Sequence, residues 1–120
     1  MNVMSFILVG AGGAIGSMLR YGIAQFNINK IFPYHTLIVN IIGSFVIGIL
    51  FGLLLRSTIS NDGWKFMATG ICGGFTTFSA LSLEGLELLQ QQRFLIFFIY
   101  FSVSVIVGLA AVYVGYTLSK

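Results

Sequence analysis

Four long apolar runs, separated by short polar segments, make up most of this 120-residue chain. They lie at about residues 3–21, 37–55, 66–83 and 94–115. A helix rises about 1.5 Å per residue, so each run can cross a hydrocarbon core of about 30 Å. Only 8% of the residues are charged, against about 25% in soluble domains. The sequence therefore predicts an all-α, multi-pass membrane protein with a single four-span domain over residues 1–120.

The third run is interrupted by small and polar residues where a membrane helix would ordinarily be aliphatic. Residues 70–79 read Gly-Ile-Cys-Gly-Gly-Phe-Thr-Thr-Phe-Ser. Glycine weakens a helix by about 1 kcal/mol relative to alanine, so adjacent Gly73 and Gly74 favour a break. Irregular backbone at membrane depth persists only where protein buries it or where it lines a polar cavity. The alternative is a close helix crossing through the GxxxG spacing of Gly70 and Gly74, and the pattern leaves both open.

Asn40 is the most costly polar side chain of the second run, because an amide in hydrocarbon must find hydrogen-bond partners. It shares a helix face with Ser44, four residues further on. Two interpretations stay open: a hydrogen bond across a helix interface, or a donor to an anion crossing the membrane. Tyr100, Ser104 and Gly108 likewise form one face of the fourth run. A hydrogen bond from Ser104 back to its own helix is the structural alternative to a functional role.

Three further residues limit the class of protein. Arg20, at the end of the first run, can extend to the interface or attract anions at a pore mouth. The single cysteine, Cys72, excludes an internal disulfide and a multi-cysteine metal site, and we expect it to act as a small apolar filler. His35 is a lone histidine, which is too little for a metal site. A net charge of +3 is too weak to indicate a nucleic-acid partner.

The basic residues are divided equally between the two ends of the predicted spans. The end with both termini has Arg56, Lys65 and Lys120, and the other end has Arg20, Lys30 and Arg93. Lys/Arg asymmetry sets the orientation of membrane proteins, so equal counts give no preferred orientation. We therefore predict dual topology, which would allow two copies to pair antiparallel about a two-fold axis in the membrane plane.

Three motifs together resemble one known family, the Fluc (CrcB) fluoride channels. The first motif lies at residues 70–79, is followed by Glu84, and resembles the signature of this family. It reads Gly-x-Cys-Gly-Gly-Phe-Thr-Thr-Phe-Ser. Motifs of the family's first two spans are similar to Gly-Ser-Met-Leu-Arg-Tyr at residues 16–21 and Asn-x-x-Gly-Ser-Phe at residues 40–45. The resemblance covers the whole chain, including its length and four-span layout.

The resemblance implies an antiparallel dual-topology dimer with two pores that conduct fluoride passively across the bacterial plasma (inner) membrane and relieve fluoride toxicity. The third helices, broken at mid-membrane, would cross at the two-fold axis. Backbone carbonyls of Gly73 and Thr76 would bind a structural Na⁺ there. The implied pore residues are Asn40, Thr77, Phe78, Ser79, Tyr100 and Ser104, with Arg20 near the vestibule. The implied partners are fluoride, membrane lipid and a second subunit, and no enzymatic activity is implied.

Two positions depart from the family pattern. A second pore phenylalanine is usual three residues after the first, where this chain has Leu81. A hydroxyl is common one turn past Ser104, where this chain has Gly108. Leucine has no positive ring edge to face an anion. Both a working homodimer and a heterodimer with a related paired subunit therefore stay open.

Two rival functions belong to other classes. A small multidrug-type exporter would require a membrane-embedded acid in the first span to exchange protons, and residues 3–21 contain none. For Glu84 we expect a charge at the end of a span, bonded to backbone or hydroxyl groups nearby. A non-transporting assembly subunit would explain the glycines but leave Asn40, Thr76, Thr77 and Ser104 without a role.

Overall fold

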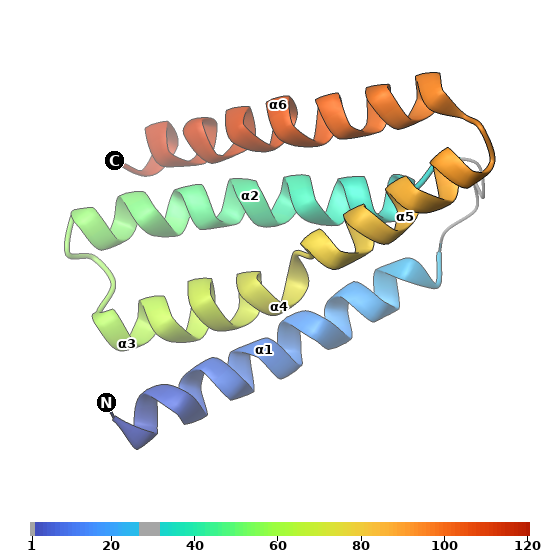
Figure 1. The fold of residues 1–120 in the computed structure, drawn as a ribbon. Helices are drawn as coiled ribbons and strands as arrows, with labels where there is room; N and C mark the ends of the chain where they lie inside the picture. The colour runs from blue at the N-terminus through green and yellow to red at the C-terminus, as the bar shows by residue number, and fades with distance from the viewer. Residues whose placement is uncertain (1, 27–31) are drawn as a thin grey trace.

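The chain folds as a bundle of four membrane-length helical segments, one of which is interrupted (Figure 1). The computed structural model describes residues 2–26 and 32–120. Its helices are α1 (Val3–Ala24), α2 (Tyr34–Leu55), α3 (Asn61–Trp64), the π-helix η1 (Lys65–Cys72), α4 (Gly73–Phe75), α5 (Phe78–Gln90) and α6 (Phe94–Ser119). No strand occurs among the described residues. The predicted all-α class with a broken third span is thus confirmed.

Successive segments alternate in direction, so both termini lie at the same end of the bundle (Figure 1). As a result α1 runs parallel to the third segment, and α2 runs parallel to α6. The bundle is 47 Å long, which exceeds the hydrocarbon thickness of about 30 Å. Lys30, one of the six basic residues counted above, lies outside the described residues.

Glycines bring α1 into backbone contact with the third segment. A Cβ on Gly16 would overlap the carbonyl oxygen of Ile71 and lie 2.7 Å from the amide nitrogen of Phe75. A Cβ on Gly74 would lie 2.5 Å from the carbonyl oxygen of Gly13. Small residues allow such approaches between membrane helices, where dispersion contacts replace the hydrophobic effect as the driving force. The GxxxG interpretation of Gly70 and Gly74 is therefore confirmed.

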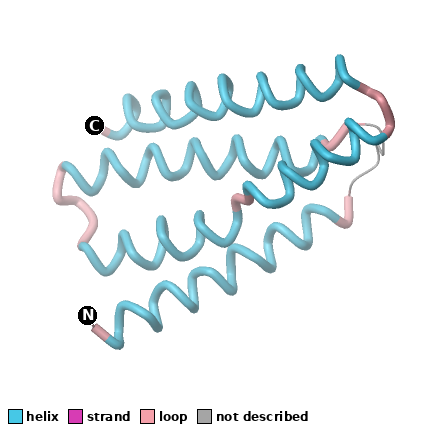
Figure 2. The backbone as a smooth tube through the Cα atoms, viewed as in Figure 1, coloured by secondary structure: helices cyan, strands magenta, loops and turns pink. Residues whose placement is uncertain are grey.

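The interruption of the third segment lies at Thr76 and Thr77, and not at the glycines where glycine propensity placed it (Figure 2). Gly73 keeps helical dihedrals, φ −63° and ψ −37°. Thr76 is extended with ψ 154°, and Thr77 is extended with φ −152° and ψ 122°. The Thr77 hydroxyl accepts a hydrogen bond from the Ala80 amide at 3.1 Å, which makes Thr77 the N-cap of α5. The glycines serve close packing, whereas a threonine cap starts the new helix.

Candidate functional site

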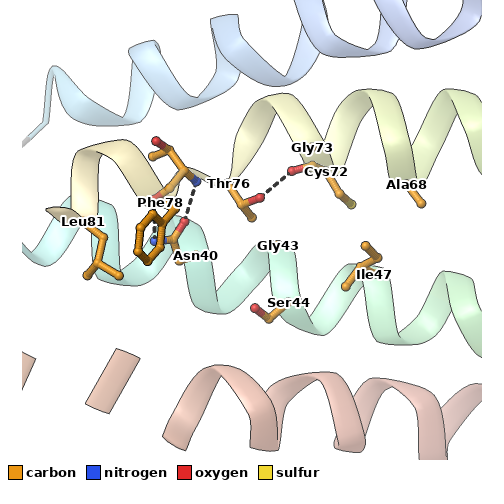
Figure 3. A pocket seen from close by; sticks show the side chains of 11 residues that line it. Asn40, Gly43, Ser44, Ile47, Ala68, Cys72, Gly73, Thr76, Phe78 and Leu81 are labelled. Atoms are coloured by element: carbon orange, nitrogen blue, oxygen red, sulfur yellow. Dashed lines mark hydrogen bonds between the residues drawn. The ribbon is translucent and has the colours of Figure 1, made fainter. Parts of the chain in front are cut away.

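Asn40 of α2 fixes the backbone at the break through two hydrogen bonds (Figure 3). Its Oδ1 accepts from the Thr77 amide at 2.9 Å, and its Nδ2 donates to the Thr77 carbonyl oxygen at 3.3 Å. An asparagine amide has two N–H donors, and the second has no partner in the described chain. The interface interpretation of Asn40 is therefore confirmed, and one donor remains for a ligand.

The hydrogen bonds at the break remove two carbonyl oxygens from the helical pattern. In an unbroken helix the Thr77 amide would donate to the Gly73 carbonyl, and the Ala80 amide to the Thr76 carbonyl. Instead the Thr77 amide donates to Asn40, and the Ala80 amide donates to the Thr77 hydroxyl. The carbonyl oxygens of Gly73 and Thr76 have thus lost their helical donors. Oxygen atoms of this kind are the ligands that hard cations prefer.

A cavity of about 280 Å³ opens beside the break (Figure 3). Its lining residues are Asn40, Gly43, Ser44, Ile47, Ala68, Cys72, Gly73, Thr76, Thr77, Phe78 and Leu81. The Phe78 side chain is 77% exposed on this face, whereas Leu81 is 8% exposed and packs with Leu88 and Tyr100. Cys72 packs in an apolar cluster with Leu50 and Ala68, as expected of a filler.

Arg20 reaches the break from the opposite side. Its Nε donates to the carbonyl oxygen of Gly74 at 3.2 Å, so its side chain is directed at the broken helix. A second cavity, of about 300 Å³, is lined by Ser17, Arg20, Tyr21, Ala24, His35, Thr36, Val39, Thr77 and Ala80. Thr77 lines both cavities. The guanidinium therefore provides positive charge at a cavity that leads to the break.

Glu84 joins α2, α5 and α6. Its Oε1 accepts from the Thr36 hydroxyl at 2.7 Å, and its Oε2 accepts from the Tyr100 hydroxyl at 2.8 Å. The Nε2 of His35 lies 3.4 Å from Oε1. The expected bonds to hydroxyl groups are confirmed. The helix continues to Gln90, and the Glu84 side chain is only 16% exposed, because its partners on two other helices draw it inward.

Sequence reasoning missed Thr36 and His35 as partners of Glu84. One signal was available for Thr36, which lies four residues before Asn40 and therefore shares its helix face. His35 offered no such signal. Its contact with Glu84 depends on how α5 packs against α2.

The predicted pore residues fall into three groups. Thr77, Phe78 and Ser79 lie at the break, where the Ser79 hydroxyl is 2.9 Å from that of Thr77. Tyr100 lies apart from them, fully buried against Glu84. Ser104 Oγ is buried with no hydrogen-bond partner in the described chain. The alternative that Ser104 bonds back to its own helix is thus wrong.

Replacing Tyr100 with phenylalanine is expected to destabilise the folded protein by about 1.5–3 kcal/mol, the usual value for a hydrogen bond to a charged group. The hydroxyl of Tyr100 is buried and donates to Glu84. Tyr113 is on the same helix and 67% exposed, so Tyr113→Phe is the matched control and should change little. Thermal unfolding in detergent measures both. Equal midpoints for the two variants would contradict the importance of the buried bond.

These features define a class: a small multi-pass membrane protein whose broken helix presents hydrogen-bonding groups to cavities on either side of the break. The chain matches the family model "CrcB-like protein, Camphor Resistance (CrcB)" over residues 7–116, and it belongs to that family. Proteins named "Fluoride-specific ion channel FluC" are similar to it over nearly their whole length. The one from Azobacteroides pseudotrichonymphae is 43% identical, with 94% of each chain covered. One from Thermus thermophilus is also 43% identical, covering 98% of this chain and 95% of its own. The one from Pyrococcus abyssi is 37% identical, covering 100% and 99%.

Proposed function

We propose that this chain forms a fluoride-selective channel that lets F⁻ leave the cell passively across the bacterial plasma membrane. The observation that carries the proposal is the full-length similarity to proteins named as fluoride-specific ion channels. The exporter alternative has no support, because residues 3–24 of α1 contain no acidic side chain. A channel of this kind moves ions without covalent chemistry, so no enzymatic role accompanies the proposal.

The polar groups at the break fit a small, strongly hydrated anion. The free N–H of Asn40 is a hydrogen-bond donor that can replace water around F⁻. The Thr77 and Ser79 hydroxyls bond to each other, so the one that accepts in this pair has its own proton left to donate to the ion. The exposed ring of Phe78 can turn its positive edge toward an anion without holding it tightly. Arg20 raises the local anion concentration at the second cavity. A fluoride ion then moves along the pore because each group of hydrogen-bond donors binds it weakly and releases it to the next group.

The proposed channel is an antiparallel dimer. The cavity at the break lies on an open face of the chain, so a second copy would close it. Phe78, a large apolar residue, is mostly exposed there, as is common at protein–protein contacts. The equal division of Lys and Arg would allow both orientations. Adding lysines at one terminus should shift the orientation measured with reporter fusions, and one fixed orientation of the native chain would contradict dual topology.

A structural Na⁺ at the dimer axis is also proposed. The residues fit, because the carbonyl oxygens of Gly73 and Thr76 have lost their helical donors and both residues line the open cavity. When bound, Na⁺ would supply a positive charge that holds carbonyl oxygens of two copies together. Dimer stability in detergent should then fall when Na⁺ is replaced by a large organic cation. Stability that does not depend on Na⁺ would contradict this site.

The function is tested by measuring fluoride efflux from liposomes that contain the purified chain alone, with chloride efflux as the control. Fast efflux of fluoride but not chloride is expected, and it would establish a working homodimer with Leu81. Leu81→Phe is measured beside it. Efflux restored only by Leu81→Phe would indicate an incomplete homodimeric pore. Absence of fluoride efflux from both chains would exclude the homodimer and require a paired subunit. Equal efflux rates for fluoride and chloride would contradict fluoride selectivity.

A further inference from the structure

Two rows of polar side chains face one another on α2 and α6. On α2 the row consists of Thr36, Asn40 and Ser44, which are four residues apart and share one face. On α6 it consists of Tyr100 and Ser104 with the same spacing. One turn further, α6 has the buried Gly108 in place of a polar residue. The α2 row is thus one member longer than the α6 row.

The two rows are in register because the helices run parallel. At one end Thr36 and Tyr100 donate to the same carboxylate, that of Glu84. A Cβ on Gly108 would lie 3.8 Å from Ser44 Oγ. The two pairs, Thr36 with Tyr100 and Ser44 with Gly108, have the same separation in sequence. This register places Ser104 opposite Asn40 and places the Ser44 hydroxyl where α6 lacks a side chain.

The Ser44 hydroxyl lines the same cavity as Asn40 and Phe78 (Figure 3). Ser44 makes no hydrogen bond to any residue that the structure describes. On α6, the Ser104 Oγ is buried and also has no partner in the described chain. Unsatisfied polar groups at membrane depth are costly unless they bond to something. The Ser44 hydroxyl lines this cavity without a protein partner, which points to an occupant that is not part of the chain.

We propose that Ser44 contacts the permeating anion and continues the row of donors beyond Ser104. Its hydroxyl donates to the ion at the level of Gly108, whose missing side chain leaves room for it. This assignment rests on the proposed fluoride conduction. With Ser44 as a donor, hydrogen bonds to the permeating anion at this level come from α2 and not only from α6.

The test compares Ser44→Ala with the native chain in fluoride efflux from liposomes. We expect Ser44→Ala to slow efflux about tenfold or more, because one hydrogen bond to an ion is removed. Ser102→Ala is the control, since Ser102 is on α6 but exposed outside the polar rows, and it should match the native rate. A Ser44→Ala rate equal to that of the native chain would overturn the assignment while leaving the channel function intact. Absence of fluoride efflux from the native chain and from Leu81→Phe would instead overturn the proposed homodimeric function, and the assignment with it.

A double variant keeps the test decisive if Ser44→Ala folds poorly. Ser44→Gly combined with Gly108→Ser moves the hydroxyl from α2 to α6 at the same level, where the added Cβ meets only ordinary contacts. We expect this transfer to restore efflux to within a few-fold of the native rate, whereas Ser44→Gly alone stays slow. If efflux through the double variant is as slow as through Ser44→Gly, a hydroxyl at this level does not support fluoride conduction, and the proposal is wrong. Size-exclusion profiles of all variants separate folding defects from conduction defects.

Discussion

Gly16→Ala is expected to destabilise the folded protein by about 1–3 kcal/mol or more. The added methyl group would overlap the carbonyl oxygen of Ile71 and press on the amide of Phe75. Both obstacles are backbone atoms, so no side-chain rotation can relieve them, and α1 would have to move away from the third segment. Overpacking in well-packed cores costs about 1–3 kcal/mol, and more when the backbone must shift. Size-exclusion chromatography and thermal unfolding in detergent measure the effect.

The matched control is Gly10→Ala in the same helix. A Cβ on Gly10 would meet nothing within 4 Å, and alanine is the better helix former by about 1 kcal/mol. We therefore expect this variant to be as stable as the native chain or slightly more stable. If both variants behaved alike, the close approach of α1 to the third segment would not be what holds the bundle together.

Asn40→Ala is expected to reduce fluoride efflux by about a hundredfold or more. The substitution removes both hydrogen bonds that hold the Thr77 backbone, and it removes the free N–H that the proposed pathway uses. Asn40→Ala therefore loses one hydrogen bond to the ion and two to the backbone beside it. Each lost bond costs about 1.4 kcal/mol, which is a tenfold change in rate. Efflux from liposomes, normalised to the amount of folded protein, gives the measurement.

Asn40→Asp separates the two roles of the amide. A carboxylate can still accept from the Thr77 amide, but it cannot donate to the Thr77 carbonyl or to an anion, and its charge would repel fluoride. We expect this variant to be silent while folding better than Asn40→Ala. The matched control is Asn61→Ala, at an exposed position of α3, which should conduct normally. Efflux from Asn40→Asp near the native rate would show that donation by the amide is not needed.

The helices themselves were predictable because long apolar runs leave few alternatives in a membrane. The position of the break in the third segment was not predictable, because it depends on the side chains of Thr77 and Asn40 and not on glycine propensity. Thr77 caps α5, and Asn40, distant in sequence, takes the amide that would continue the helix. Local propensity is a weak prior when a partner from another helix competes for the backbone.

The individual site residues could be selected from the sequence, but their partners could not. Asn40 was recognisable as a costly amide, and its bond to Thr77 emerges only from the packing of α2 on the third segment. Glu84 was recognisable as an isolated acid, yet its inward orientation depends on hydroxyls from α2 and α6. Ser44 was recognisable as sharing a face with Asn40, but its place at the level of Gly108 depends on the register of two parallel helices.

The two hydrogen bonds between Asn40 and the Thr77 backbone have a consequence for biosynthesis. Because chains are made from the N-terminus, α2 leaves the ribosome before the third segment. Before it meets Asn40, the Thr77 amide has only the Gly73 carbonyl to bond with in lipid. We expect the third segment to insert as one continuous helix and to bend when it docks on α2. A peptide of residues 61–90 in bilayers should then show protected amides through 76–77, and exchange there as fast as at its ends would contradict this order of events.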